Sequence, residues 1–183
     1  TVGSLYLGYA VNSYGVATHT AGTFTATNLI LGYAAGSAGI YNLSGGTLKV
    51  TDISVGAGSG TLTVSGTART HTVSGNWNFA NGAFTVSSGT MTFDKASGTQ
   101  TVNSGSAGSY FNNLTHSAAG TLLISGSTLD VNGTLTNSSG TIDTYGNDIK
   151  IAGNYVNTSG TITNSNAGDT TWTLYLDGGE GVA

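Results

Sequence analysis

The sequence contains no cysteine and no proline, and it contains very few charged residues. The absence of cysteine excludes disulfide bonds and thiolate metal sites. The absence of proline suits a backbone in which most amides donate to a strand ladder. Charged residues make up 7% of the 183 residues, whereas an average globular domain contains about 25%. The polar surface must therefore be built mainly from serine, threonine and asparagine.

Positive charge is especially scarce, because the chain has only four lysine and arginine residues and a net charge of −4. Binding to a nucleic-acid backbone needs a basic surface, so we expect no nucleic-acid partner. No apolar run approaches the ~18 residues of a transmembrane helix, so we expect no membrane insertion by this segment. The chain starts at Thr1 without a signal peptide, and we expect it to be a processed or excised segment.

Apolar residues and glycines recur with a regular period in the first third of the chain. Three stretches align without insertion, namely SLYLGYA (4–10), NLILGYA (28–34) and DISVGAG (52–58). Leu5, Leu29 and Ile53 share one position of this repeat. Tyr9 and Tyr33 share another, and we expect their rings to stack. A period of roughly 20 to 24 residues that is built from short apolar segments is typical of a solenoid.

A second register, with a shorter period, runs through the last third of the chain. It aligns Leu129 with Ile149 and Val131 with Ile151. In the looser middle, VSGNW (73–77) shares a pattern with VNGTL (131–135) and IAGNY (151–155). This pattern places Trp77 where Leu135 and Tyr155 stand and predicts a core position for it.

Within each repeat, apolar and polar residues alternate with a period of two, which indicates strands with one buried face. In GTLKV (46–50), Leu48 and Val50 point one way while Thr47 and Lys49 point the other. Glycine and asparagine between these strands supply the backbone conformations of sharp corners. An antiparallel β-sandwich is the alternative, but it would not need a repeat without gaps.

We therefore predict an all-β fold, a right-handed parallel β-helix of roughly eight coils of 20–24 residues. Residues 1–183 are expected to form one continuous solenoid segment. Its coils have period 24 over 1–66, are irregular over 67–110, and have period about 20 over 111–183. The predicted stacking ladder consists of Leu5, Leu29, Ile53, Leu129, Ile149, Val131 and Ile151.

Threonine pairs separated by one residue are the most suggestive surface feature. Outward threonines stacked on a solenoid wall can order water in an ice-like lattice, although threonine is also the commonest outward residue of strands. The candidate ligand-facing residues are Thr23, Thr25, Thr61, Thr63, Thr134, Thr136, Thr161 and Thr163. An ice-binding rank should be unbroken, and the aligned positions hold Lys49, Leu123 and Asp143 where threonine should repeat.

Catalytic chemistry has little support, and we expect no catalytic, cofactor or metal site. Among the acids, only Asp143 and Asp148 lie close together, across one corner. A polysaccharide-degrading enzyme would need such a carboxylate pair facing one groove. Asp130 and Lys150 occupy matching repeat positions, and we expect them to form an ion pair between neighbouring coils. The three histidines occupy unrelated repeat positions and do not have the spacing of metal ligands. We expect them to be solvated or partly buried corner residues.

Two stretches carry a resemblance to known proteins. GIYNLSGGTLKV (39–50), preceded by LILG (29–32), resembles the repeats of bacterial autotransporter-type passenger domains and related secreted β-helical adhesins. The stretch from 110 to 142 is similar to coils of large bacterial surface and filament proteins. The resemblance implies a right-handed parallel β-helix, export and an extracellular or cell-surface location in a bacterium. It says little about a ligand.

Three classes of function follow. The leading hypothesis is a structural or adhesive segment of an extracellular surface or fibre-forming protein, a rigid rod without catalysis. The expected partners are the same chain, by self-association or by continuation end to end, and a host or matrix surface, a glycan or ice. The alternatives are an ice- or carbohydrate-binding module and a polysaccharide-degrading enzyme.

Overall fold

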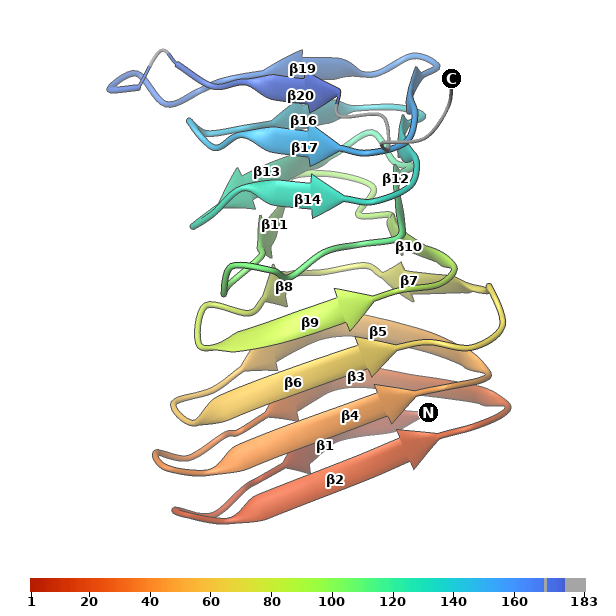
Figure 1. Cartoon of the computed structure of the whole chain (residues 1–183), viewed down its shortest axis with the longest axis vertical. Coiled ribbons are helices and arrows are strands. Elements are labelled where there is room, and N and C mark those ends of the chain that lie inside the picture. Colours follow the sequence, from red (N-terminus) through yellow and green to blue (C-terminus); the bar gives the residue numbers. More distant parts are fainter. Residues whose placement is uncertain (170, 177–183) are drawn as a thin grey trace.

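The computed structural model describes residues 1–169 and 171–176, and this part of the chain forms twenty strands and no helix. The strands wind around one axis in about eight turns that are stacked on one another (Figure 1). Each turn pairs with the next in parallel register, as in the pairing of β3 with β5 and of β14 with β17. The prediction of an all-β parallel solenoid is confirmed.

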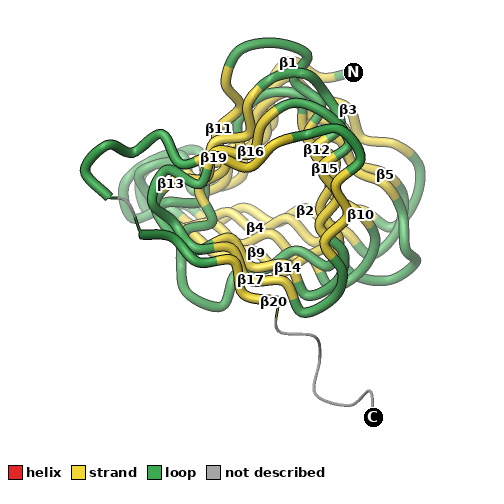
Figure 2. The backbone as a smooth tube through the Cα atoms, turned by 90° about the horizontal axis from the view of Figure 1, so that it is seen from above, coloured by secondary structure: helices red, strands yellow, loops and turns green. Residues whose placement is uncertain are grey.

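Three walls surround the axis, as the view along the rod shows (Figure 2). The first wall contains β1 (Val2–Leu7), the second halves of β3 (Thr23–Leu31) and β5 (Thr47–Val55), β8 (Trp77–Asn78), β11 (Thr99–Asn103), β13 (Thr121–Ser125), β16 (Thr141–Asp143) and β19 (Thr161–Thr163). The second wall contains the first halves of β3 and β5, β7 (Thr70–Val73), β10 (Thr90–Phe93), β12 (Asn113–His116), β15 (Leu135–Asn137) and β18 (Tyr155–Asn157). The third wall contains β2 (Tyr14–His19), β4 (Ala38–Leu43), β6 (Ser59–Val64), β9 (Gly82–Val86), β14 (Leu129–Val131), β17 (Ile149–Ile151) and β20 (Leu174–Leu176).

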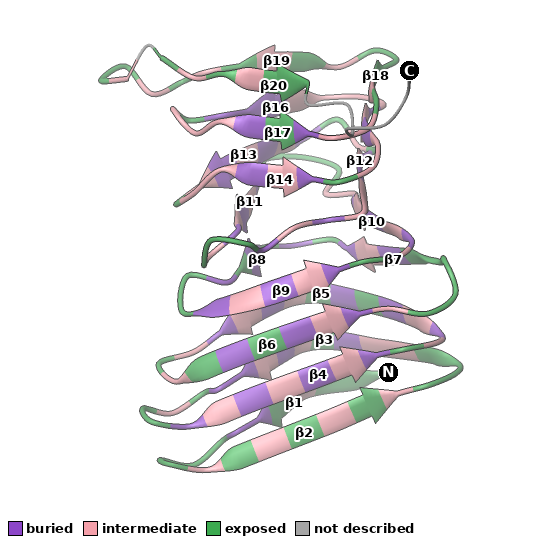
Figure 3. Ribbon diagram, viewed as in Figure 1, coloured by how far each residue is buried: buried purple, intermediate pink, exposed green. Residues whose placement is uncertain are grey.

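The core is a continuous column of apolar side chains inside the three walls. Buried residues recur along the strands of successive turns (Figure 3). On the first wall, paired residues of successive turns are Leu5, Leu29, Ile53, Trp77, Val102 and Ile124. All of these except Leu5 in the first turn are fully buried. On the third wall, Leu129 pairs with Ile149 and Val131 with Ile151, and all four are buried. Like side chains thus stack on like side chains, which removes apolar surface from water at every turn.

The spacing between paired residues differs from wall to wall. On the first wall Leu29 pairs with Ile53, which is the longer repeat of the opening turns. In the same pair of turns on the third wall, Tyr41 pairs with Leu62, which is a shorter separation along the sequence. The corner between the two walls absorbs the difference, because a corner can lose residues without disturbing the ladders on either side.

Trp77 lies in the core, but not at the predicted position. Its ladder partners are Ile53 and Val102 on the first wall, whereas Leu135 pairs with Leu114 and Tyr155 on the second wall. The shared sequence pattern was therefore misleading. Counted along the chain, turn four contains β7 to β9, turn five β10 and β11, turn six β12 to β14, turn seven β15 to β17 and turn eight β18 to β20. In turn four the pattern spans the corner that leads from the second wall into the first. In the later turns it spans the corner that leads from the third wall into the second.

Polar side chains, the buried Gln100 and the exposed Asn76 among them, form hydrogen bonds with backbone groups at or near the corners. The Gln100 side chain is 1% exposed, and its amide nitrogen donates to the backbone carbonyls of Val73, at 2.6 Å, and Gly75. The Asn76 side-chain oxygen accepts a hydrogen bond from the Thr101 amide, at 2.9 Å, one turn further on. Such bonds satisfy backbone groups that the ladder leaves unpaired at each bend.

Candidate functional site: a threonine-rich face

The second wall presents an array of hydroxyl groups on its outward side, which we call the threonine face. Its outward residues form three columns along the rod, each with one residue per turn. The first column contains Thr23, Thr47, Thr70, Thr90, Asn113 and Thr134. The middle column contains Thr25, Lys49, Thr72, Thr92, Thr115, Thr136 and Val156. The third column contains Thr27, Thr51, Ser74, Asp94, Ser117, Ser138 and Thr158.

Strand alternation explains why the hydroxyls share one side of this wall. The residues between the first and middle columns point inward and are Phe24, Leu48, His71, Met91, Leu114 and Leu135. All of them except Phe24 are buried. Burial of these neighbours fixes the strands, and the branched Cβ atom restricts each threonine to few side-chain rotamers. The hydroxyl and methyl groups are therefore held in regular positions.

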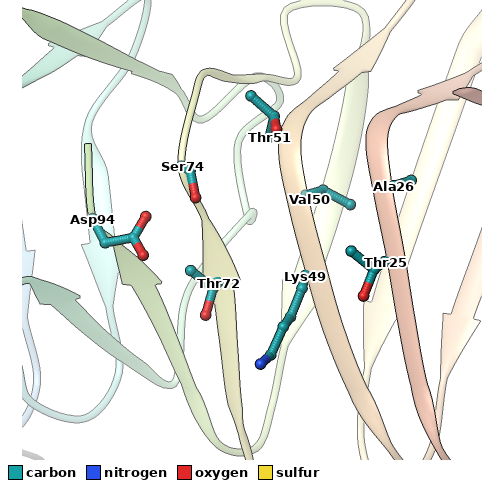
Figure 4. Close-up of a pocket in the computed structure, with 8 residues that line it drawn as sticks. All are labelled: Thr25, Ala26, Lys49, Val50, Thr51, Thr72, Ser74 and Asp94. Carbon is teal, nitrogen blue, oxygen red and sulfur yellow. The ribbon is translucent and has the colours of Figure 1, made fainter. Parts of the chain in front are cut away.

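Two shallow hollows flank the middle column. One, of about 340 Å³, lies between the middle and third columns and is lined by Thr25, Lys49, Thr51, Thr72, Ser74 and Asp94 with Ala26 and Val50 (Figure 4). The other, of about 460 Å³, lies between the first and middle columns and includes Arg69. Four threonine or serine side chains line each hollow, beside charged and apolar residues, and Lys49 and Thr72 border both hollows.

Lys49 and Asp94 are the charged residues within the three columns. The Lys49 side chain is exposed and extends from β5, and the Asp94 carboxylate lies across the hollow beyond Thr72 (Figure 4). Within the described residues, the Asp94 Oδ1 atom is buried and has no hydrogen-bond partner. The two charges have opposite sign, so the three columns together are close to neutral, and Arg69 adds a positive charge beside the second hollow.

The structure distributes the eight candidate threonines over all three walls. Thr23 and Thr25 on β3, with Thr134 and Thr136 on or next to β15, belong to the threonine face. Thr61 and Thr63 lie on β6 in the third wall, and Thr161 and Thr163 lie on β19 in the first wall. On the first wall, the Thr141 and Thr161 hydroxyls are 3.1 Å apart.

The residues that were expected to interrupt one rank of threonines also lie on different walls. Leu123 on β13 pairs with Asp143 on β16, and both belong to the first wall. Lys49 alone among the three lies on the threonine face. The expectation that all three break one rank was therefore wrong, because equal repeat position in the sequence did not mean the same wall.

Sequence reasoning missed Thr70 and Thr72, which continue the threonine face in turn four, and Thr115 in turn six. The triplet THT (70–72) has the same form as the triplets that were recognised. A search for threonine pairs with any buried residue between them would have found Thr70 and Thr72.

The two acids that lie close together in the sequence, Asp143 and Asp148, accept hydrogen bonds from groups of the last two turns. Asp143 is 7% exposed, and its carboxylate accepts hydrogen bonds from the amides of Tyr145 and Ser165 and from the Ser165 hydroxyl. The Asp148 carboxylate accepts a hydrogen bond from the Thr173 amide at 2.7 Å. Both side chains therefore stabilise the bends between turns seven and eight.

Asp130 and Lys150 stand on neighbouring turns at matching positions. Partial burial raises the pKa of Asp130, and the Lys150 charge lowers it by less than burial raises it. The Lys150 ammonium lies 5.9 Å from the centre of the Tyr175 ring. Lys150 thus combines a weak attraction to Asp130 with a cation–π contact.

All three histidines lie on strands, so the expectation that they are corner residues was wrong. His71 on β7 and His116 on β12 are inward-facing and at most 2% exposed. His19 on β2 lies at the position that Leu43 occupies one turn later, and its Nδ1 is 3.0 Å from the Tyr41 hydroxyl. Among the described residues, no group of three or more His, Asp or Glu side chains is arranged to hold a metal ion.

Exposed tyrosines gather at the first corner of the opening turns. Tyr9 stacks on Tyr33 with ring centres 5.2 Å apart and planes 9° from parallel, as expected. Tyr6 meets both rings edge-on. The stacked pair is therefore a rigid part of the corner.

Comparison of the chain with protein-family models, with curated proteins and with solved structures finds no match. Across residues 1–169 and 171–176, no helix is long and apolar enough to cross a membrane.

Proposed function

We propose that this segment is a rigid, non-catalytic rod in an extracellular bacterial surface or fibre-forming protein. The observation that carries the proposal is the continuous inner column, in which Leu29, Ile53, Trp77 and Val102 pair turn after turn. A solenoid whose core has no break resists bending, because each turn is packed on both neighbours. The resemblance of residues 39–50 to adhesin repeats supports the extracellular location.

The weakly charged surface fits the same role. A rod that is exposed to variable salt outside the cell gains from surfaces solvated by hydroxyl and amide groups, because such surfaces respond little to ionic strength. Ser, Thr and Asn provide most of the polar positions along the walls.

Hydrogen–deuterium exchange of the isolated chain tests the proposal. A rigid rod should show slow exchange of ladder amides in all turns from β3 to β17, on every wall, with faster exchange confined to the corners and the two terminal turns. Rapid exchange throughout turns four and five would reveal a hinge in the middle of the solenoid and would contradict a rod role.

A further inference from the structure

The threonine face differs from the other two walls in its regularity. From β3 to β15, six successive turns present a threonine or asparagine in the first column and, Lys49 excepted, a threonine in the middle column. The outward positions of the first wall include Asp52, Leu123 and Asp143 and are therefore chemically mixed. The third wall carries exposed Tyr14 and Val16.

The spacing of this array is set by the backbone. Along the rod, hydroxyls repeat at the ladder spacing of about 4.8 Å, and across each strand they repeat after two residues, at roughly 6.7 Å. These two repeats, at right angles, are close to the oxygen repeats of the prism plane of hexagonal ice. A side chain on a paired strand cannot drift from this grid, because its neighbours above and below are tied into the same ladder.

Hollows lie between the columns of the threonine face. The spaces on either side of the middle column, of about 340 and 460 Å³, are open to solvent. Each is lined by four threonine or serine side chains and by Lys49, with Asp94 in the first and Arg69 in the second. Each is roomy enough for a row of waters, which occupy roughly 30 Å³ each in the liquid. Threonine hydroxyls can bond such waters, and the adjoining methyl groups restrict where the waters lie.

We propose that the threonine face binds ice, by holding rows of water in these hollows at positions that match the lattice. The rigid rotamers of threonine mean that little side-chain entropy is lost on binding. Each additional turn adds the same contacts, so the affinity grows with the length of the array. The outward positions of the face carry no aromatic side chain, which favours ice over a sugar polymer as the ligand.

Lys49 is the main defect of the array. Its ammonium group is strongly hydrated and holds water in its own geometry. It also borders both hollows. Replacing it with threonine would restore an unbroken run of threonines in the middle column, from Thr25 to Thr136.

Ice-affinity partitioning and ice-crystal shaping test the proposal on the purified chain. The wild-type protein should be incorporated into slowly growing ice and should facet single crystals. Lys49→Thr should increase both effects, a gain that a folding defect cannot produce. Thr92→Lys, in the middle of the face, should abolish both. Thr61→Lys, which places the same charge on β6 of the third wall, should retain wild-type activity.

Three outcomes would overturn the proposal. In the first, ice excludes both the wild type and Lys49→Thr as fully as an unrelated soluble protein. In the second, Thr92→Lys and Thr61→Lys behave alike while circular dichroism shows both folded. In the third, the chain is retained on insoluble cellulose or chitin but excluded from ice. The rod proposal would survive each of these, because hydrogen exchange measures it separately.

Discussion

Buried histidine is the least expected feature at the scale of single residues. His71 accepts a hydrogen bond at Nδ1 from the Leu48 amide at 3.2 Å, which requires the unprotonated nitrogen. Burial lowers the pKa of His71 below its ordinary value, and the charges of His19 and Arg69 lower it further. Burial also lowers the pKa of His116. The hydrogen bond between His116 and Asn137 raises this pKa, but by less than burial lowers it.

We predict that the protein loses stability as the pH falls below about 6.5, the ordinary histidine value. The folded state keeps both imidazoles neutral, so the unfolded state binds more protons below that pH and the free energy of unfolding decreases. The stability is fully present above the unfolded pKa and is lost as the pH falls toward the lower folded pKa. Urea unfolding at about pH 7.5 and about pH 5.5 measures the change, above the range in which most aspartates titrate.

The matched control for this prediction is the double variant His71→Gln and His116→Gln, whose amides do not titrate. Its free energy of unfolding should be lower than that of the wild type at the higher pH but should change much less between the two pH values. An equal pH dependence in both proteins would place the titrating groups elsewhere.

At the scale of strands and corners, glycine marks the places where one turn passes close to the next. Gly32 follows β3 with φ of 58°, and a Cβ atom there would overlap the backbone carbonyl of Ser59 on the next turn. Gly22 precedes β3 with φ of 78°, and around it the described chain leaves open space for a Cβ. The two glycines share the left-handed conformation and differ only in their surroundings.

We predict that Gly22→Ala lowers the free energy of unfolding by about 1–2 kcal/mol, the cost of a left-handed alanine. Gly32→Ala should cost clearly more, because the ladder between β4 and β6 must also shift to admit the methyl group. Urea denaturation of the two variants side by side measures both costs. Equal losses would mean that the corner yields freely and that close stacking of turns does not require glycine at Gly32.

On the scale of the whole molecule, an aromatic cluster joins the early and the late turns of the solenoid. Trp77 contacts Phe84 and Phe111 with ring centres 4.9 and 5.1 Å apart, and Phe79 and Phe93 complete the cluster. These rings fill the core where the repeat changes period. Large side chains can bridge turns whose registers differ, because they reach partners that smaller residues would miss.

We predict that Trp77→Ala lowers the free energy of unfolding by about 3–5 kcal/mol, the usual cost of removing a buried aromatic ring. Hydrogen exchange should show that turns four and five lose protection before the turns at either side. Trp172→Ala, at a half-buried position in the last turn, should cost much less. Comparable losses in the two variants would contradict a central role for the cluster.

Much of the fold was predictable because strand alternation and corner chemistry are local. Leu5, Leu29 and Ile53 were placed in one column from their spacing alone, and they pair as expected. The corners that separate these three residues have the same length in successive turns. A constant spacing in the sequence therefore corresponds to pairing on one wall. The same logic placed Asp130 beside Lys150.

The candidate site was only partly predictable, because corners change length without changing the strands. Repeat alignment placed Leu123 and Lys49 at equivalent positions. In the structure Lys49 pairs with Thr72 on the second wall, and Leu123 lies on the first wall. A few residues gained or lost at a bend shift all later residues relative to the period. Local patterns carry no signal for that shift.

The sequence by itself determined that the chain forms short parallel strands with apolar residues inward and hydroxyl residues outward. Its period of two and its glycine corners predict short strands with one buried face, and the repeat without gaps favours stacked turns over an antiparallel sandwich. Only the tertiary structure decided which wall each strand joins, and therefore that threonines from six separate turns form one face. That assignment depends on how neighbouring turns pack against each other, which is a property of the assembled solenoid.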